Sequence, residues 1–288
     1  MGLLGGGAVT LENECARILK NECVGKGLHV MTLFSPGIAA SVEPGQFVHM
    51  KVPGMEDHIL RRPFSVYARD AEAGTLDVLY QVVGFGTAHM AGLGAESAAA
   101  YGRNGKPVWL IGPVGRGWRP PENARRALLV GGGVGAAPLF MLCEKLAGAG
   151  VRTDVVLGAQ TAHALVCRAR YESLLAGAEC CADNAPRCAT DDGSFGRAGF
   201  CTSLAKEALA QAAAEDAPYD YAAVCGPEPL MRIVAEQAGA AGVFCEVSLE
   251  RRMACGVGAC LSCVVDTTRG KRRACVDGPI FNAQEVKW

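Results

Sequence analysis

Four cysteines close to the end of the chain have a spacing that suits metal chemistry. Cys255, Cys260 and Cys263 form the pattern C-x4-C-x2-C, and Cys275 supplies a fourth thiol further on. Thiolates with this spacing hold the irons of a [2Fe-2S] cluster. The residues between them are small and include glycines, which let backbone N–H groups approach inorganic sulfides. The pattern therefore predicts an iron–sulfur site with these four cysteines as ligands.

Two other interpretations of the four cysteines stay open. A structural zinc site normally shows paired C-x2-C knuckles, whereas only Cys260 and Cys263 are paired in that way. Four unligated buried thiols would leave the glycine-rich loop unexplained, so zinc is the main alternative to iron. The other cysteines, apart from Cys225, lack a ligand spacing and are expected to be unligated.

Two short motifs in the first third of the chain could bind a diphosphate. The stretch 62–65, Arg-Pro-Phe-Ser, places a guanidinium, an aromatic face and a hydroxyl at the start of a predicted strand. Arginine suits a diphosphate because its fork gives bidentate, charge-assisted hydrogen bonds. The stretch 84–87, Gly-Phe-Gly-Thr, follows another strand and precedes a short helix, whose first amides can bind an anion. The simpler interpretations are an exposed basic residue and a plain turn.

The elements that carry these two motifs read as short strands separated by glycine and proline. A hairpin signal at 24–27 joins the first two of them. Closely spaced strands with turn residues between them indicate a small antiparallel β-barrel. The expected strands are Cys15–Cys23, Leu28–Ser35, Gln46–Val52, Arg62–Ala68, Thr75–Val83 and Pro107–Ile111.

The order of the two motifs along one barrel resembles the flavin-binding half of the ferredoxin–NADP reductase superfamily. That resemblance implies a bound FAD. By position it assigns flavin contacts to Arg62, Pro63, Phe64, Ser65, Leu79, Tyr80 and Gln81, and phosphate contacts to Gly86 and Thr87. Two departures matter: Phe64 stands where relatives carry Tyr, and Phe85 stands where they often carry Lys.

A glycine-rich turn in the middle of the chain predicts a nucleotide site. The buried-type strand Ala127–Val130 runs into a glycine run at 131–135, and a helix is expected over Ala137–Ala147. This arrangement directs amides and the helix dipole at a pyrophosphate. The next predicted strand, 154–159, has its only acid, Asp154, at its start rather than its end. The stretch therefore differs from the common dehydrogenase fingerprint and instead resembles the NAD(P) module of the reductase superfamily.

The same resemblance assigns residues to the two halves of the nicotinamide nucleotide. The candidate phosphate-binding residues are Gly131, Gly132, Gly133 and Gly135, unless this turn serves only to pack the helix on the sheet. Asp192, in the loop 190–196, would lie near the adenosine ribose, and its charge favours NAD over NADP. Cys225 and Gly226 match a C-G-P motif beside the nicotinamide, where Cys225 is assigned the catalytic position. An ordinary buried cysteine is the simpler interpretation of Cys225.

Composition limits the remaining possibilities. The chain has 288 residues, a formal net charge of −1 and fourteen cysteines. This charge predicts no nucleic-acid partner, and the lack of a long apolar run predicts no membrane span. Residues 1–14 show no secretory signal, so we expect a cytoplasmic protein with reduced thiols. The stretch Gly94–Asn104 reads as an added loop without an assigned function.

We therefore expect α/β plus all-β architecture in three parts. Residues 1–119 should form an antiparallel FAD-binding β-barrel, residues 120–246 a Rossmann-like NAD-binding α/β domain, and residues 247–288 a small [2Fe-2S] domain. A nicotinamide gives two electrons as hydride, whereas a cluster accepts one at a time. A flavin handles both kinds of transfer, so no general acid or base is required.

This module order resembles the electron-transfer subunit of heteromeric dihydroorotate dehydrogenase, most specifically in the stretches 250–260 and 275–281. The resemblance implies pyrimidine biosynthesis and a separate FMN-containing catalytic subunit, in a heterotetramer that holds each subunit twice. The small subunits of NADH-dependent ferredoxin:NADP oxidoreductase and of sulfide dehydrogenase have the same modules and are alternatives. A non-catalytic, zinc-stabilised nucleotide-binding protein is the alternative from another class.

Overall fold

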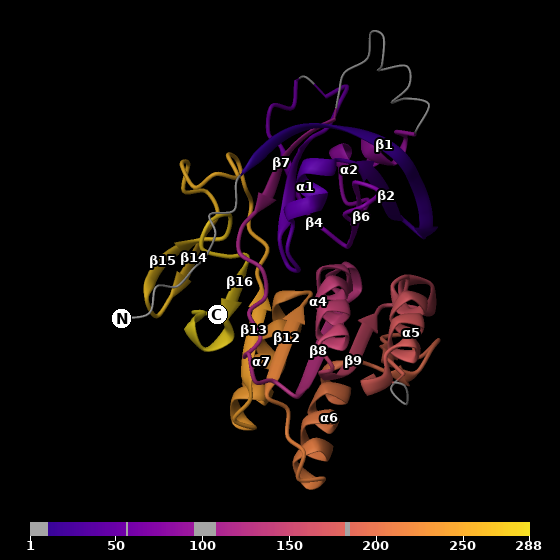
Figure 1. The fold of residues 1–288 in the computed structure, drawn as a ribbon, viewed down its shortest axis with the longest axis vertical. Helices are drawn as coiled ribbons and strands as arrows, with labels where there is room; N and C mark the ends of the chain where they lie inside the picture. The colour runs from indigo at the N-terminus through magenta and orange to yellow at the C-terminus, as the bar shows by residue number, and fades with distance from the viewer. Residues whose placement is uncertain (1–10, 56, 95–107, 182–184) are drawn as a thin grey trace.

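The computed structural model describes residues 11–55, 57–94, 108–181 and 185–288. A curled β-sheet, an α/β domain and a C-terminal segment that touches both are arranged as Figure 1 shows. The predicted added loop lies outside the described residues, apart from Gly94. Among the helices of the described part, none is long and apolar enough to cross a membrane.

The N-terminal sheet is antiparallel, with its strands in the order β4-β3-β7-β1-β2-β6-β5. Its strands are β1 (Glu12–Gly25), β2 (Leu28–Phe34), β3 (Phe47–Lys51), β4 (Arg62–Ser65), β5 (Ala68–Asp70), β6 (Thr75–Gln81) and β7 (Val108–Val114). Two short helices accompany them, α1 (Pro36–Ser41) and α2 (Phe85–Ala91). The hairpin turn joins β1 to β2, and α2 is the short helix expected after 84. The expected strand Arg62–Ala68 is instead divided into β4 and β5, because the chain passes from one edge of the sheet to the other at Val66 and Tyr67. The other expected strands form, with Pro107 outside the described residues.

The sheet curls because its two edge strands are consecutive in sequence. β4 and β5 lie at opposite edges, yet only Val66 and Tyr67 separate them. The Val66 amide donates to the carbonyl of Gln46 (3.2 Å), and the Tyr67 amide donates to that of Asp77 (2.8 Å). A two-residue link can join the edges only if the sheet rolls into a barrel around its buried apolar face.

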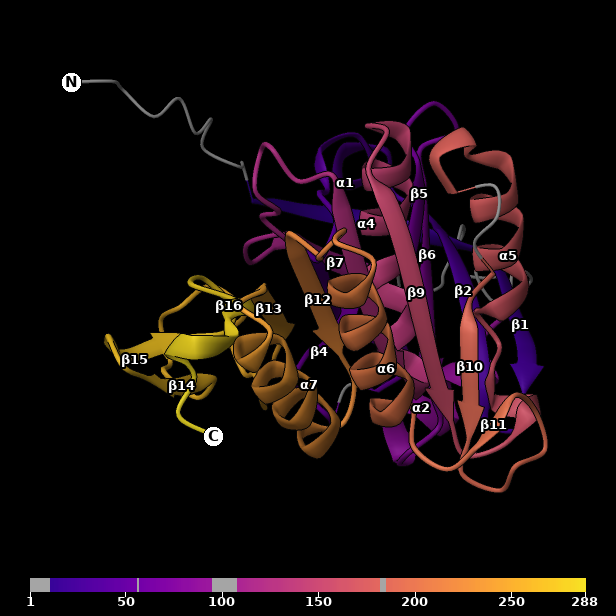
Figure 2. The same cartoon turned by 90° about the horizontal axis from the view of Figure 1, so that it is seen from below.

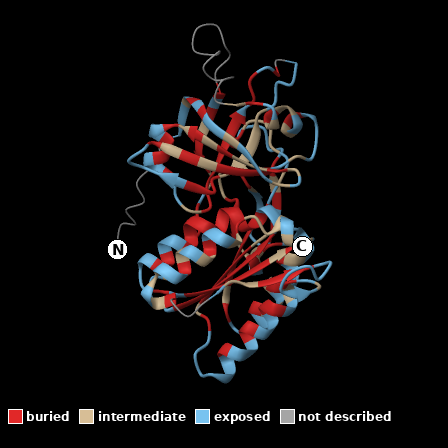
Figure 3. Cartoon of the chain, turned by 90° about the vertical axis from the view of Figure 1, so that its right-hand side faces the viewer, coloured by how far each residue is buried: buried red, intermediate tan, exposed pale blue. Residues whose placement is uncertain are grey.

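The second sheet is parallel except for its last strand, in the order β11-β10-β9-β8-β12-β13-β16. Its strands are β8 (Arg126–Gly132), β9 (Arg152–Ala159), β10 (Arg187–Thr190), β11 (Arg197–Ala198), β12 (Tyr221–Cys225), β13 (Phe244–Ser248) and β16 (Ile280–Asn282). The helices are α4 (Ala137–Gly148), α5 (Arg168–Gly177), α6 (Thr202–Ala214) and α7 (Glu228–Ala240). Alternate residues of β8 face opposite cores: Leu129 packs with α4 and α5, and Leu128 with α6 and α7. Helices therefore cover both faces, and the central strands are buried (Figures 2 and 3).

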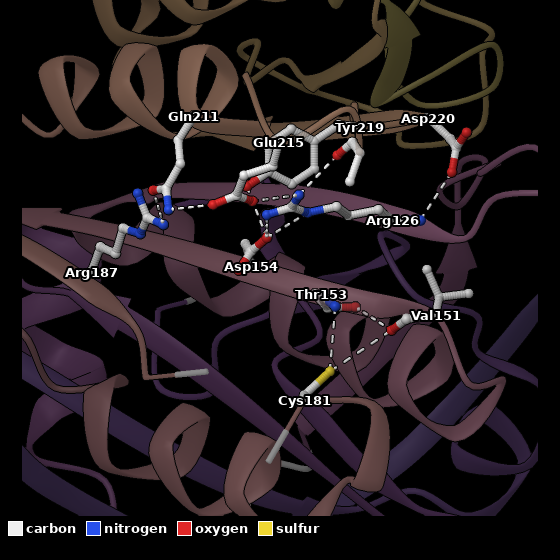
Figure 4. Close-up of polar contacts among 11 residues, drawn as sticks. Arg126, Val151, Thr153, Asp154, Cys181, Arg187, Gln211, Glu215, Tyr219 and Asp220 are labelled. Atoms are coloured by element: carbon white, nitrogen blue, oxygen red, sulfur yellow. Dashed lines mark hydrogen bonds and ion pairs between the residues drawn. The ribbon is translucent and has the colours of Figure 1, made fainter. Parts of the chain in front are cut away.

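The amino ends of the parallel strands are closed by a buried polar network (Figure 4). The Arg126 guanidinium, on β8, donates from Nε to Oδ2 of Asp154, on β9 (3.1 Å), and from Nη1 to the carbonyl of Ala217 (2.8 Å). The Tyr219 hydroxyl donates to the same Asp154 oxygen (2.8 Å). Asp220 accepts the backbone amide of Arg126 (2.9 Å). Asp154 thus has a structural role at the amino end of the sheet, which is the end at which the sequence placed it.

The C-terminal segment forms a small hairpin and then returns to the α/β sheet. The hairpin pairs β14 (Val264–Thr267) with β15 (Gly270–Arg273), and β16 adds antiparallel to β13. The Arg116 amide, just after β7, donates to the carbonyl of Gly278 (2.6 Å). The segment that holds the four cysteines is therefore fixed to both larger parts of the molecule.

Candidate functional site

The four C-terminal cysteines stand in two pairs. The Sγ of Cys255 accepts the backbone amides of Val257 and Cys260 (both 3.4 Å), and the Sγ atoms of Cys263 and Cys275 are 3.3 Å apart. In the described part of the chain, no three metal-binding side chains converge on a single-ion position. Paired thiols suit a two-iron cluster, in which each iron takes two cysteine ligands.

The loop between these cysteines is shaped around the space they enclose. Gly256 and Gly258 have φ of +70° and +83°, the left-handed region that favours glycine, and Leu261 also adopts positive φ (+60°). A Cβ on Gly258 would lie 2.6 Å from Cγ2 of Val276. Nη1 of Arg273 donates to the Gly258 carbonyl (3.3 Å) and fixes the loop to β15. The backbone thus forms a cradle that larger residues would fill.

The pairs also differ in electrostatics. A hydrogen bond with the Ser262 hydroxyl lowers the pKa of the exposed Cys260 thiol to about 6. Burial, with a further contribution from the neighbouring Cys263, raises the pKa of Cys275 to about 12. Cys260 therefore offers a thiolate readily, whereas Cys275 loses its proton only when a cation binds. This donor set fits an iron–sulfur cluster held between an exposed and a buried side.

The two predicted flavin motifs meet in space. A Cβ on Gly86, at the start of α2, would lie 2.7 Å from Cζ of Arg62, so the guanidinium rests on the glycine backbone. The Thr87 hydroxyl accepts the amides of Val83 (2.9 Å) and Gly84 (3.2 Å). Thr87 therefore holds the turn in shape, and Arg62 with the first amides of α2 forms the positive end of the site.

The other predicted flavin residues take different faces of the barrel. Leu79 is buried against the α/β domain, Gln81 is exposed, and the rings of Phe64 and Tyr80 meet edge to face at 6.0 Å. β4, which includes Pro63 and Ser65, pairs only with β3, so its outer edge can bind a ligand through the backbone.

Asn21 is a site-shaping residue that sequence reasoning missed. Its Oδ1 accepts the Tyr80 hydroxyl (2.9 Å), and its Nδ2 donates to the carbonyls of Met90 and Leu93 (both 2.7 Å). Asn21 therefore fixes the C-terminal end of α2, the helix whose first residues include Gly86. The one available signal was a polar residue within a long predicted strand.

The glycine turn after β8 packs against the turn after β12. A Cβ on Gly135 would lie 2.5 Å from the carbonyl oxygen of Cys225, and one on Gly132 would lie 2.7 Å from Cδ1 of Leu230. A Cβ on Gly226 would lie 3.1 Å from the backbone of Gly132. These glycines are needed for packing between the two turns, and Gly131 is needed within its own turn, where a Cβ would lie 2.8 Å from Cα of Ala136.

Gly133 differs from its neighbours in the turn. Its φ is +56°, and a Cβ there would meet nothing within 4 Å. Gly133 is therefore the residue whose backbone faces open space at the carboxyl end of the sheet, where a ligand of an α/β fold binds. The packing interpretation therefore holds for the neighbouring glycines, and phosphate binding at Gly133 stays a prediction.

Cys225 ends β12 beside this open space, level with Gly131 on β8 and Ser248 on β13. Burial raises the pKa of its thiol to about 12, against a smaller opposing effect of a hydrogen bond with Ser248. The thiol is therefore neutral at physiological pH and is unsuited to act as a nucleophile or base. A small neutral side chain at this point suits hydride transfer, which needs no proton shuttle.

The acidic loop expected near the ribose lies at the same edge of the sheet. The Asp192 amide donates to the carbonyl of Gln160, beyond β9 (3.2 Å), and hydrogen bonds from Ser194 lower the pKa of the Asp192 carboxyl. Arg197 is paired with Glu207 and offers no free charge to a 2′-phosphate. A missed neighbour is Arg168, which stacks on the Phe195 ring (4.3 Å) and is already paired with Glu172 (3.0 Å).

His49 is a second residue that sequence reasoning missed. It lies on β3, is fully buried, and its ring contacts the cysteine loop at Gly256. Burial and the nearby charge of Arg61 lower the pKa of His49 to about 4, so its imidazole is neutral at physiological pH. No local sequence pattern indicates that His49 lies near both β4 and the cysteine loop.

The fold is that of ferredoxin reductases. A structure of the NADH-dependent reduced ferredoxin–NADP oxidoreductase aligns with a TM-score of 0.77 and 28% identity, covering 99% of this chain and 92% of that one. A ferredoxin NADP+ reductase from Neisseria gonorrhoeae aligns with a TM-score of 0.62, covering 84% and 95%, and at 15% identity shows the fold alone. Fold and site together define a flavin-type oxidoreductase with an added iron–sulfur segment.

Sequence comparison gives the family. Residues 250–287 match the iron–sulfur cluster binding domain of dihydroorotate dehydrogenase B, and residues 129–236 match an oxidoreductase NAD-binding domain. Electron transfer subunits of dihydroorotate dehydrogenase B (NAD(+)) are 34% identical over 277 residues in Desulforamulus reducens and 36% over 279 in Bacillus caldolyticus. These alignments cover 95% of this chain and 97% and 98% of those relatives. The chain belongs to this family of electron transfer subunits. The match to an iron–sulfur domain supports iron, rather than zinc, as the metal of the four cysteines.

Proposed function

We propose that the chain carries electrons between a partner flavoenzyme that oxidises dihydroorotate and NAD+, in pyrimidine biosynthesis. When bound, FAD would supply the chemistry that links the two-electron transfer of a nicotinamide to the one-electron transfer of a [2Fe-2S] cluster. The carrying observation is the paired arrangement of Cys255 with Cys260 and of Cys263 with Cys275, on a segment fixed to both the barrel and the nucleotide sheet.

In this scheme, residues of this chain bind and orient FAD and the pyridine nucleotide. Arg62 and the first amides of α2 hold the diphosphate of FAD, and the outer edge of β4 holds its ring. The open backbone at Gly133 receives the phosphates of the pyridine nucleotide, and Asp192 selects NAD by disfavouring a 2′-phosphate. Cys225 leaves room for the nicotinamide to lie against the flavin. We assign these roles within segments 1–119, 120–246 and 247–288.

The partner is an FMN-containing catalytic subunit, in a heterotetramer with each subunit present twice. We place the assembly in the cytoplasm, where reducing conditions keep the thiols available for iron. The exposed residues of the cysteine loop, Val257 and Leu261, are the apolar side chains (46% and 61% exposed) that such a partner would cover.

Replacing Cys260 with Ser tests the proposal. The variant should lose iron and acid-labile sulfide, while NADH still reduces its flavin under anaerobic conditions, because the nucleotide and flavin sites do not contain Cys260. Cys15→Ser is the matched control, since Cys15 is also exposed and lies on β1, and its iron content should equal that of the wild type. Full iron in Cys260→Ser would refute the ligand assignment.

Arg62→Ala tests the flavin site. Loss of the guanidinium beside Gly86 should reduce the FAD retained on purification, while Arg69→Ala, which removes contacts with the carbonyls of Ala39 and Ala40, should retain it. Equal flavin content in the two variants would show that the diphosphate lies elsewhere.

A second function is favoured by the structural likeness to the NADH-dependent reduced ferredoxin–NADP oxidoreductase. In that case the partner would be a larger flavin and iron–sulfur subunit rather than an FMN enzyme. Purification from the native cell and identification of the bound subunit separates the two functions. Recovery of a dihydroorotate-oxidising FMN protein supports the first, and recovery of a ferredoxin-oxidising subunit supports the second.

A further inference from the structure

The side chains of β3 alternate between two environments. Val48 and Met50 belong to the core of the barrel, whereas Phe47 and His49 point to the opposite face, as expected for the two-residue period of a strand. Phe47 shares a hydrophobic cluster with the buried thiols Cys263 and Cys275. The outer face of β3 is therefore the surface on which the cysteine segment packs.

His49 lies between the flavin motif and the cysteine loop. Its Nδ1 lies 2.5 Å from the position that a Cβ on Gly256 would take, and Gly256 directly follows Cys255. On its other side, His49 is opposite Pro63 in the β3–β4 register, and Nη1 of Arg61 donates to its carbonyl (3.3 Å). The buried imidazole thus contacts the loop that carries Cys255 and Cys260. It belongs to β3, the strand that pairs with the predicted flavin-binding strand β4.

The ring of His49 has no hydrogen-bond partner among the described residues. Its residue is 0% exposed, and both Nδ1 and Nε2 are unsatisfied. The carbonyls of Arg61 and Cys255 lie near enough to favour the protonated ring weakly, but neither satisfies a ring nitrogen. A neutral imidazole carries one N–H donor, and leaving such a donor unpaired in the interior costs about 1–3 kcal/mol. The position is therefore explained by an acceptor that is not part of the polypeptide.

An iron–sulfur cluster supplies such acceptors. Its thiolate and sulfide sulfurs accept hydrogen bonds, and donors to these sulfurs set the reduction potential of the cluster. A donor raises that potential, because reduction adds negative charge to the sulfurs and strengthens the hydrogen bond. The unsatisfied ring nitrogens and the contact of the ring with Gly256, the residue after Cys255, both place the imidazole beside the loop that would hold the cluster.

We propose that His49 is a positioning residue that donates an N–H hydrogen bond to a sulfur of the cluster, raises its reduction potential and holds the cysteine loop against the flavin-binding strand. The inference rests on the proposed function, since it requires the cluster. It goes beyond the identity of the cluster ligands, because it concerns how the reduction potential of the cluster is set for one-electron transfer between cluster and flavin.

Three variants of the complete protein test this role. His49→Leu fills a similar volume without a donor, whereas His49→Asn keeps an amide near the place of Nδ1, the nitrogen closest to the loop. His29→Leu is the matched control, because His29 also has a buried, unpartnered Nδ1 but lies on β2, where its ring stacks on Tyr80 (5.4 Å). Iron, acid-labile sulfide, the EPR spectrum of the reduced cluster and its midpoint potential are measured for each.

In His49→Leu, the ratio of reduced to oxidised cluster at a fixed ambient potential should fall about tenfold, which corresponds to about 59 mV for a one-electron couple. A tenfold change is the size expected from one hydrogen bond to a charged group. The EPR spectrum should shift with it. His49→Asn should recover part of both changes, and His29→Leu should match the wild type.

An unchanged potential and spectrum in His49→Leu would overturn the proposal. So would equal shifts, or equal loss of iron, in His49→Leu and His49→Asn, because the residue would then act only by packing. Loss of iron in His49→Leu alone, with iron kept in His49→Asn, supports the donor role. Absence of iron and sulfide from the wild type would instead refute the proposed function, so the two failures are distinguishable.

Discussion

The two ends of the parallel sheet differ in composition: one is a network of polar side chains, and the other consists of glycine turns. At the amino end, Arg126 and Asp154 form a buried ion pair that Tyr219 completes, with side chains only 7% and 10% exposed for the pair (Figure 4). At the carboxyl end, the two turns are built on glycines, and the position of a Cβ on Gly133 opens onto empty space. Both ends belong to the same short strand, β8.

This difference separates stability from binding along one strand. The amino end replaces water with fixed partners, because buried polar groups without partners are costly. The carboxyl end instead places the Gly133 backbone beside open space, which we propose a nucleotide fills. Substitutions at the amino end should therefore change the free energy of unfolding, and those at the carboxyl end should change ligand binding.

Asp154→Ala should have the largest effect. It leaves the buried Arg126 guanidinium with only the more distant, exposed carboxylate of Glu215 (3.6 Å). Removal of one partner of a buried pair costs about 3–5 kcal/mol. The shift in the urea midpoint measures this loss, and the surviving folded protein should still transfer hydride from NADH to flavin at the wild-type rate. The double variant Arg126→Met with Asp154→Leu is the control and should recover most of the stability. A fall in hydride transfer in the folded variant would break the proposed separation.

Gly135→Ala should have the next largest effect, at the other end of the sheet. The added methyl meets the Cys225 carbonyl at 2.5 Å and forces the two turns apart. A displacement of about 1 Å at a reacting site can lower a rate about a hundredfold, so flavin reduction by NADH should slow by about that factor. Stopped-flow absorbance under anaerobic conditions measures it. Gly148→Ala, at the end of α4 with open space around it, should leave the rate unchanged.

Asp192→Asn should have a smaller effect, confined to the choice of nucleotide. Because solvent screens this exposed charge, its removal should weaken discrimination against NADPH only about fivefold. The ratio of the dissociation constants for NADPH and NADH gives this value, with Asp191→Asn as the comparison in the same loop. An unchanged ratio would place the ribose away from Asp192.

The smallest effect should come from Asp220, again at the amino end. Hydrogen bonds from the Arg125 and Arg126 amides lower the pKa of the Asp220 carboxyl in the folded state. Its contribution to stability is therefore present above the unfolded pKa, about 3.9, and is lost as pH falls through the lower folded value. Asp220→Asn should flatten the pH dependence of the urea midpoint below about pH 4. The same slope in wild type and variant would contradict this origin.

Much of the fold was predictable, because local signals agreed with it. Glycine and proline marked the ends of the barrel strands, and the short helix after Gly84 forms as α2. The amino-end position of Asp154 followed from reading β9 as a strand of the nucleotide sheet. The spacing of the four cysteines indicated iron, and the structure brings their sulfurs together in pairs.

Other features depend on which segments meet in space. The contact of Arg62 with Gly86 joins two motifs that only resemblance to a family had linked. Asn21 and His49 lie within strands and carry no motif, so their roles arise from what packs against them. The return of β16 to the nucleotide sheet was also unforeseen, since a three-residue strand leaves no periodic pattern.

The return of β16 has a consequence for how this protein can be divided. A chain cut after Leu249 would lose the cysteines and would also strip β13 of its antiparallel neighbour, baring a row of unpaired amides and carbonyls. Such an edge invites self-association. The cysteine segment therefore completes the α/β sheet, and the two parts cannot be separated without exposing a strand edge.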